Sequence, residues 1–256
     1  MENHNSITEP SMESGLKYDP NSWTRVFSLQ WYKHQMSGWS TLSYWLLVVG
    51  IIFQVIVGSQ HGINGLAITS TIAGIIGFTT TISITNGKAI NGILGFISAA
   101  MLIYVASVTG NYSDIIMQGA YIVLLDIPIL FNKQWGGDFE PRKLKVKYAL
   151  QTLGLFILFL AMTLILDLFI LHSPQAYLDA VSASIGLTGA VLTVRRFRFS
   201  YVMWTLQGLF SVALWIQTAI NGNPVWVLMF TYILYLCNDM LSFFDKNIKW
   251  FHPDKK

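Results

Sequence analysis

Three aspartates stand inside otherwise apolar stretches of the sequence, and they are the residues best suited to specific chemistry. Asp126, Asp167 and Asp239 each lie among aliphatic and aromatic neighbours. A charged group inside a bilayer is unfavourable, so such carboxyls mark ligand sites or contacts between helices. For Asp126 and Asp239 two interpretations stay open. They would either bind substrate hydroxyls or a cationic substrate group, or form a helix contact with the carboxyl protonated. For Asp167 we favour the helix contact.

Four side-chain amides occur in the same apolar stretches, and an amide can donate and accept hydrogen bonds at once. They are Asn91, Gln118, Gln207 and Asn238. Trp204 precedes Gln207 by about one helical turn, so its indole and the amide can share a helix face. A flat aromatic ligand would stack on the indole and bond to the amide. Interfacial anchoring is the alternative for Trp204. Tyr235 is a further aromatic candidate, which bundle packing would explain equally well.

Eight long apolar segments must hold these side chains in place. The chain has 256 residues, of which 53% are hydrophobic and only 11% charged. We expect transmembrane segments over residues 42–59, 64–84, 89–108, 113–132, 148–171, 176–194, 200–220 and 225–244. A helix of about 20 residues crosses a hydrocarbon core about 30 Å thick. Because lipid offers no partner to an unpaired backbone amide, the sequence predicts an all-α integral membrane protein with eight transmembrane helices.

The basic residues indicate how these helices are oriented. All 16 lysines and arginines lie outside the predicted helices, and an eight-helix arrangement puts every one of them on the same side of the membrane. The densest groups run from Arg142 to Lys147 and from Arg195 to Arg198. By the positive-inside rule that side is the cytoplasm, so both termini are expected there.

The predicted organisation begins with a cytoplasmic tail, residues 1–40. Within it Trp23, Phe27 and Trp31 recur at intervals of four, which is typical of an amphipathic helix in the membrane interface. A disordered tail is the alternative. The later divisions are an extra transmembrane helix at 41–60, a first three-helix repeat at 64–132, a cytoplasmic loop and linker helix at 133–172, a second three-helix repeat at 176–244, and a cytoplasmic tail at 245–256.

An internal repeat indicates the two three-helix units. A shift of 113 residues, without gaps, aligns the second to fourth predicted helices with the sixth to eighth. Four of the identical pairs are Thr80 with Thr193, Gly95 with Gly208, Ser98 with Ser211, and Asp126 with Asp239. Units that begin four helices apart share one orientation, so this is a parallel repeat about an axis along the membrane normal. Repeats of this kind form transport paths at their interface, which favours a carrier.

Other classes of chemistry lack their sequence signatures. The sequence contains no P-loop, nucleophile elbow or nucleotide-binding glycine fingerprint, so we expect neither a catalytic site nor an ATP-driven step within the chain. The five histidines fall in tails or at helix ends, without metal-ligand spacing inside the membrane, so neither a metal nor another cofactor is expected. The basic loops are explained by topology and do not indicate nucleic-acid binding. The expected partners are a small-molecule substrate and the lipid bilayer.

The order of these elements resembles the PnuC family of bacterial vitamin transporters over about residues 64–250. The residues that carry the resemblance are Asn91 to Gly95 after Lys88, Gly110-Asn111-Tyr112 followed by Gln118, Val194 to Arg198, Trp204, and Asn238. The resemblance implies a three-plus-one-plus-three bundle like that of the SWEET sugar transporters, in the bacterial inner membrane. It also implies facilitated diffusion of nicotinamide riboside or a related vitamin, with phosphorylation inside the cell trapping the substrate, and a homo-oligomer, namely a trimer.

The chain departs from that family at one motif. Members specific for nicotinamide riboside usually carry Trp-x-x-Trp at the cytoplasmic end of the fourth helix. This chain instead reads Asp126-Ile127-Pro128-Ile129-Leu130-Phe131, with Trp135 nearby. Thiamine, riboflavin and deoxynucleosides are therefore alternative substrates. Two alternative mechanisms are a proton-coupled carrier, with Asp126 or Asp239 as the relay, and a binding subunit that requires a separate energising complex.

The residues and the resemblance together predict a substrate site between the two three-helix units. Trp204 and Tyr235 would stack on the ligand, and polar side chains would bond to it. The full set of expected substrate-binding residues is Asn91, Gln118, Asp126, Trp204, Gln207, Tyr235, Asn238 and Asp239.

Overall fold

The structure, a computed structural model, describes residue 19 and residues 22–60, 64–135, 139–173, 175–222 and 225–253. Half of the predicted N-terminal tail, namely residues 1–18, 20 and 21 with Lys17 among them, lies outside the described residues. The same is true of the end of the C-terminal tail, with Lys255 and Lys256.

Long helices form where the sequence predicts them, and each boundary lies within two residues of the expected one when the segments that directly continue two of them are included. The helices are α2 (Thr41–Ser59), α3 (Gly65–Thr85), α4 (Asn91–Thr109), α5 (Tyr112–Tyr121), α7 (Val146–Ile165), α8 (Ala176–Val194), α9 (Ser200–Ile220) and α10 (Trp226–Phe244). Two of them continue as π-helical turns. The first is η3 (Ile122–Asp126), which leads into α6 (Ile127–Phe131), and the second is η5 (Leu166–Ile170) after α7.

Seven of these helical segments, within the described residues, are long and apolar enough to cross a membrane. They are the predicted helices other than α9, with α5 to α6 counted as one segment and α7 with η5 as another. The multi-pass membrane fold is thus confirmed. Helix α9 has a suitable length of 21 residues, but it carries the amides of Gln207 and Gln217, which lower its mean hydropathy. Its membrane crossing, and with it the eighth span, stays a prediction.

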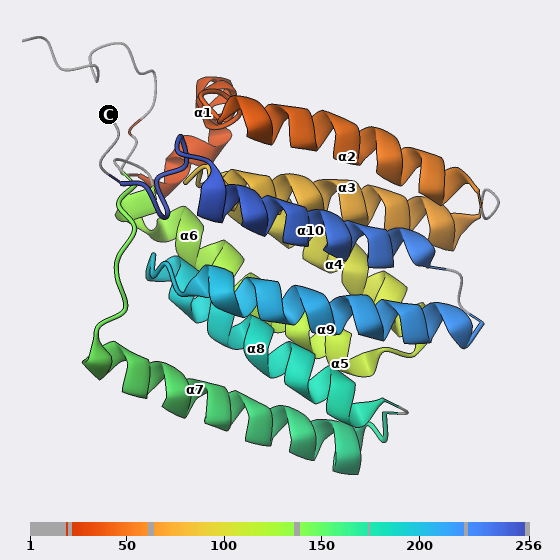
Figure 1. Ribbon diagram of the computed structural model, residues 1–256. Coiled ribbons are helices and arrows are strands. Elements are labelled where there is room, and N and C mark those ends of the chain that lie inside the picture. Colours follow the sequence, from red (N-terminus) through yellow and green to blue (C-terminus); the bar gives the residue numbers. More distant parts are fainter. Residues whose placement is uncertain are drawn as a thin grey trace, which may run out of the picture.

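Six helices form a closed ring, in which each contacts the next. The order around the ring is α3, α4, α5, α8, α9 and α10, and α10 returns to α3. The two remaining long helices lie at opposite edges of the bundle (Figure 1), with α2 against α3 and α10, and α7 against α8. The ring therefore has an interior, and α2 and α7 stand outside it.

The burial of the helices follows this arrangement. In the most apolar window of α8, 72% of the residues are buried, against 11% in that of α7. The outward side chains of α7 include Leu150, Leu153 and Ile157, all more than half exposed. In water such a surface would drive association, whereas in a bilayer it meets hydrocarbon. Helix α7 thus has the composition of a lipid-facing helix, and α8 that of a central one.

Several loops gather at one end of the bundle, which we call the basic end and define by residues 86–90, 132–135, 139–145, 195–199 and 245–253. Hydrogen bonds join these loops: Arg142 N–H donates to Arg196 O over 2.7 Å, and Trp135 Nε1 donates to Val194 O over 3.3 Å. Helices α1 (Leu29–Gln35) and α6 lie at the same end (Figure 1). Burial lowers the pKa of Lys88, and the positive charge of Lys249 lowers it further. Charge is therefore crowded here.

A buried aromatic cluster fills the centre of the basic end. Trp250, with none of its surface exposed, donates from Nε1 to Ile84 O at the end of α3 over 2.9 Å. Its ring centroid lies 4.8 Å from that of Phe139 and 5.0 Å from that of Tyr201. The segment after α10 is thus packed into the bundle rather than extended into solvent.

The predicted interfacial helix is divided in two. Trp23–Phe27 forms a 3-10 helix, Ser28 is extended, and α1 follows. The extended residue breaks the interval of four, because it rotates the second segment relative to the first. As a result Trp23 and Phe27 are 52% and 78% exposed, whereas Trp31 is buried against the bundle. Only the first two aromatic residues can meet a membrane interface.

Close helix packing generates a test of the fold. An alanine Cβ at Gly92 would lie 2.5 Å from the backbone carbonyl oxygen of Asp126, which cannot move alone. We expect Gly92→Ala to destabilise the protein by about 1–3 kcal/mol, as overpacking does, and to lower its melting temperature in detergent.

Gly154→Ala on α7 is the matched control, because nothing lies within 4 Å of the added Cβ. Alanine favours the helix over glycine, so this variant should melt at the wild-type temperature or above it. Equal melting temperatures for both variants would contradict the close approach of α4 to η3.

Candidate functional site

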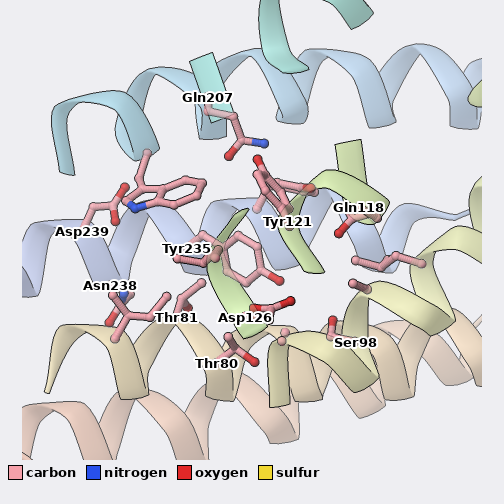
Figure 2. A pocket seen from close by; sticks show the side chains of 18 of the residues that line it. Thr80, Thr81, Ser98, Gln118, Tyr121, Asp126, Gln207, Tyr235, Asn238 and Asp239 are labelled. Carbon is pink, nitrogen blue, oxygen red and sulfur yellow. The ribbon is translucent and has the colours of Figure 1, made fainter. Parts of the chain in front are cut away.

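The ring encloses a cavity with a volume of about 110 Å³ (Figure 2). A single water needs roughly 10–15 Å³ by such a measure, so the space admits a small organic molecule in part or whole. Its lining comes from α3, α4, α5 with η3, α9 and α10. The polar and aromatic members of the lining are Thr80, Thr81, Ser98, Gln118, Tyr121, Asp126, Tyr201, Trp204, Gln207, Tyr232, Tyr235, Asn238 and Asp239.

Seven of the eight expected site residues lie in this lining, and Asn91 does not. Asn91 is the first residue of α4, buried, and its Nδ2 donates to Lys88 O over 2.5 Å. The structure therefore places Asn91 at the basic end, where it holds the loop before α4.

Asp126 is positioned by an irregular helix. It is the last residue of the π-helical turn η3, in which Ile127 N–H bonds to Ile122 O, and Pro128 follows. Proline supplies no N–H donor, so the regular hydrogen-bond ladder is interrupted here. Single π-helical turns of this kind occur frequently at functional sites. The carboxyl lies against α4 at Gly95, where an added Cβ would come within 2.1 Å of Oδ1. Glycine at 95 is thus required for this placement.

Asp239, the repeat mate of Asp126, has a different environment. It lies on the regular helix α10, and Thr205 Oγ1 donates to its Oδ2 over 3.1 Å. Its neighbour Asn238 donates from Nδ2 to Thr85 Oγ1 over 2.8 Å, and Thr85 in turn bonds to the Tyr201 hydroxyl over 2.9 Å. The carboxyl of Asp239 therefore has a partner, and a hydrogen-bonded chain ties α10 to α3 and α9.

Two glutamines line the cavity, Gln207 from α9 and Gln118 from α5. Gln207 Nε2 donates to Ser211 Oγ over 2.9 Å, and Gln118 Nε2 donates to Asp114 Oδ1 over 3.2 Å. In Figure 2 both amides point toward Tyr121. Each glutamine is thus held by a residue on its own helix, one turn after it for Gln207 and one turn before it for Gln118.

Aromatic rings form the remaining wall. Tyr121 meets Trp204 edge to face with centroids 5.8 Å apart, and Tyr232 meets Tyr235 in the same manner at 5.0 Å. The indole Nε1 of Trp204 donates to Thr193 Oγ1 over 2.8 Å, which fixes the ring plane. Trp204 lies at the cavity, so the alternative of interfacial anchoring does not account for its position.

Sequence reasoning missed several lining residues. Tyr121 and Tyr201 line the cavity but are not among the expected site residues. Thr80 and Ser98 had a signal, because each is identical to its mate in the internal repeat. The tyrosines had none, since a tyrosine in a bundle packs more often than it binds.

Two other residues named from the sequence lie outside the cavity lining. Asp167 on η5 accepts a hydrogen bond from Ser113 Oγ on α5, as expected for a contact between helices. Trp135 is 2% exposed and packs on Phe139 and Trp250 at the basic end. Trp135 therefore does not replace the missing tryptophan pair at the cavity.

Known proteins share both the sequence pattern and the fold. Residues 67–251 match the family described as nicotinamide mononucleotide transporter. The nicotinamide riboside transporter PnuC of Neisseria mucosa is 24% identical over 239 residues, which cover 86% of this chain and 87% of the relative. The crystal structure of the vitamin B3 transporter PnuC has a TM-score of 0.73 at 18% identity, over 89% of this chain and 100% of that one. The family match spans most of the sequence, so this chain belongs to the PnuC, or nicotinamide mononucleotide transporter, family of membrane transporters.

Proposed function

We propose that the chain carries nicotinamide riboside, or a related ribosylated or aromatic vitamin, across the membrane by facilitated diffusion. The observation that carries this proposal is the cavity inside the six-helix ring, which combines aromatic faces, amides and carboxyls. A curated relative named for nicotinamide riboside transport supports the choice of substrate. The chain is a transporter by family, not an enzyme.

The cavity suits each part of such a ligand. Aromatic rings prefer edge-to-face or offset contacts with other rings, which Tyr121, Trp204 and Tyr235 offer. A carboxamide needs both a donor and an acceptor, which Gln118 and Gln207 provide. Ribose hydroxyls donate well to carboxylates, and charge-assisted hydrogen bonds are the strong ones. The proposed site therefore consists of the seven expected residues in the lining.

The helix contacts support a parallel repeat as the transport device. In the ring, α5 contacts α8 and α10 contacts α3, so the third helix of each unit meets the first helix of the other. Likewise α2 packs on α3 as α7 packs on α8. This pattern is the one expected of two units related by an axis through the cavity. Rocking of one unit against the other would expose the site to each side in turn.

Orientation, location and assembly follow as further parts of the proposal. The concentration of Lys and Arg at the basic end favours that end facing the cytoplasm, with both termini inside. A bacterial cell membrane is the expected location. A trimer is implied by the resemblance alone.

Substrate identity is tested by ligand-induced stabilisation of the purified protein. A ligand that binds only the folded state raises apparent stability with the logarithm of its saturation. We expect nicotinamide riboside to raise the melting temperature, and thiamine, riboflavin and deoxynucleosides to raise it less. A larger shift with one of the other compounds would replace the substrate and keep the carrier.

Two substitutions test the site. We expect Asp239→Asn and Gln207→Ala each to lower substrate affinity at least several-fold without loss of expression, because the first removes a carboxylate and the second an amide that lines the cavity. Titration calorimetry measures this. Gln217→Ala is the matched control, since Gln217 lies on the same helix but is exposed on the outer surface. Unchanged affinity in both site variants would remove the proposed site.

The mechanism is tested in liposomes that contain only this chain. Facilitated diffusion predicts uptake that stops when inside and outside concentrations are equal and that does not respond to a pH gradient. Accumulation driven by a pH gradient would instead indicate proton coupling. Binding without any uptake would indicate a subunit that requires an energising complex.

A further inference from the structure

We propose that Asp126 recognises positive charge on the aromatic ring of the ligand, so that the carrier selects permanently cationic ring compounds over their neutral counterparts. This inference rests on the proposed function, and it deepens it by assigning charge selectivity to one residue.

The first observation is the charge of the cavity. Among the described residues that line it, Asp126 and Asp239 can be negative, and no lysine, arginine or histidine accompanies them. The remaining lining residues are neutral. Ionisable side chains inside a membrane protein face its interior, pair with one another or with backbone carbonyls, and mark substrate or ion pathways. Here the lining supplies no basic partner, so a cationic ligand would complete the charge balance.

The second observation distinguishes Asp126 from Asp239. Asp126 is 2% exposed, and its Oδ2 is fully buried without a hydrogen-bond partner among the described residues. Asp239, by contrast, accepts a hydrogen bond from Thr205. A buried polar atom without a partner is unfavourable unless something that binds satisfies it. Of the two carboxyls in the lining, Asp126 is therefore the one with a buried oxygen that finds no hydrogen-bond partner in the part of the chain that the structure describes, and it points into the cavity near Tyr235 (Figure 2).

The third observation is that Asp126 cannot easily turn away to another partner. Its carboxyl fills the space left by Gly95, and the π-helical turn that ends at Asp126 sets its direction. A group held in this way is preorganised for a ligand rather than free to reorient.

The aromatic side chains of the cavity also favour a cationic ligand. The faces of tryptophan and tyrosine rings attract cations through their quadrupoles, more strongly where water is excluded. Trp204, Tyr121 and Tyr235 surround the cavity from three different helices. A flat ring that bears a positive charge would gain from the carboxylate and from these faces at once, whereas a neutral ring of the same shape would gain from stacking alone.

A pair of related ligands tests the preference for the charged ring, and the variants described below assign it to charge rather than to ring aromaticity. Nicotinamide riboside has a cationic pyridinium ring, and its 1,4-dihydro form keeps the ribose and the carboxamide but has no ring charge. We would titrate the full-length purified protein with each, by calorimetry. The expected result is at least tenfold tighter binding of the cationic form to the wild type. Comparable affinity for the two forms would overturn the inference, whereas the proposed function would stand. Binding of neither form would overturn the proposed function and the inference with it.

The variants locate the selectivity. Asp126→Asn keeps the side-chain shape and removes the charge, so it should lower the affinity ratio of the two forms at least several-fold, mainly by weakening the cationic form, and leave only the preference that the aromatic faces supply. Gln207→Ala is the matched control in the same cavity: it should weaken both forms by a similar factor and leave the ratio unchanged. An unchanged ratio in Asp126→Asn would assign the selectivity elsewhere and overturn the role of Asp126. The wild-type comparison needs no substitution, so poor folding of a variant does not prevent the test.

Discussion

A polar group inside a bilayer must find its partners within the protein, and most of this architecture follows from that constraint. Backbone amides are satisfied by long helices, and side-chain polar groups are turned away from lipid. The outer helix α7 is accordingly almost wholly apolar on its exposed side, whereas α8 is buried and rich in serine, threonine and small residues. Asp126, Asp239, Gln118 and Gln207 have only one low-energy place, the interior of the ring. These polar side chains therefore converge from several helices on the cavity.

The same constraint decides how much the sequence reveals. Helix positions were predictable within two residues because a span needs an apolar run of fixed length, and loops break such runs sharply. The convergence of Asp126, Gln207 and Asp239 was predictable from the repeat and from their misfit with lipid. Tyr235 was expected at the site, but Tyr121 and Tyr201 were not, because a tyrosine fits lipid interfaces, bundle cores and binding sites alike. The break at Ser28 was not predictable either, since it depends on where Trp31 finds a tertiary pocket.

The internal repeat hides an asymmetry that only the structure exposes. Asp126 and Asp239 occupy equivalent sequence positions, yet one ends a π-helical turn next to Gly95 and the other lies on a regular helix bonded to Thr205. The glycine mates differ too, since a Cβ at Gly208 would meet a flexible Leu236 side chain rather than a carboxyl. The two positions that the predicted repeat pairs therefore differ in their local chemistry. A ligand with an aromatic ring at one end and a sugar at the other has two chemically different ends, as the cavity has two different carboxyl environments.

The packing of Trp250 has a consequence for how the chain can be handled and how it can move. Tyr201 belongs both to the cavity wall and to the aromatic cluster at the basic end, with its ring centroid 5.0 Å from that of Trp250. The segment after α10 therefore supports the cavity wall from behind, because Trp250 packs on Tyr201. A truncation or fusion that displaces Trp250 would remove the packing behind Tyr201 and so weaken the cavity wall, although no lining residue is changed. If the substrate leaves past Tyr201, Trp250 must move with it. The segment after α10 would then contribute to the energy barrier for substrate release.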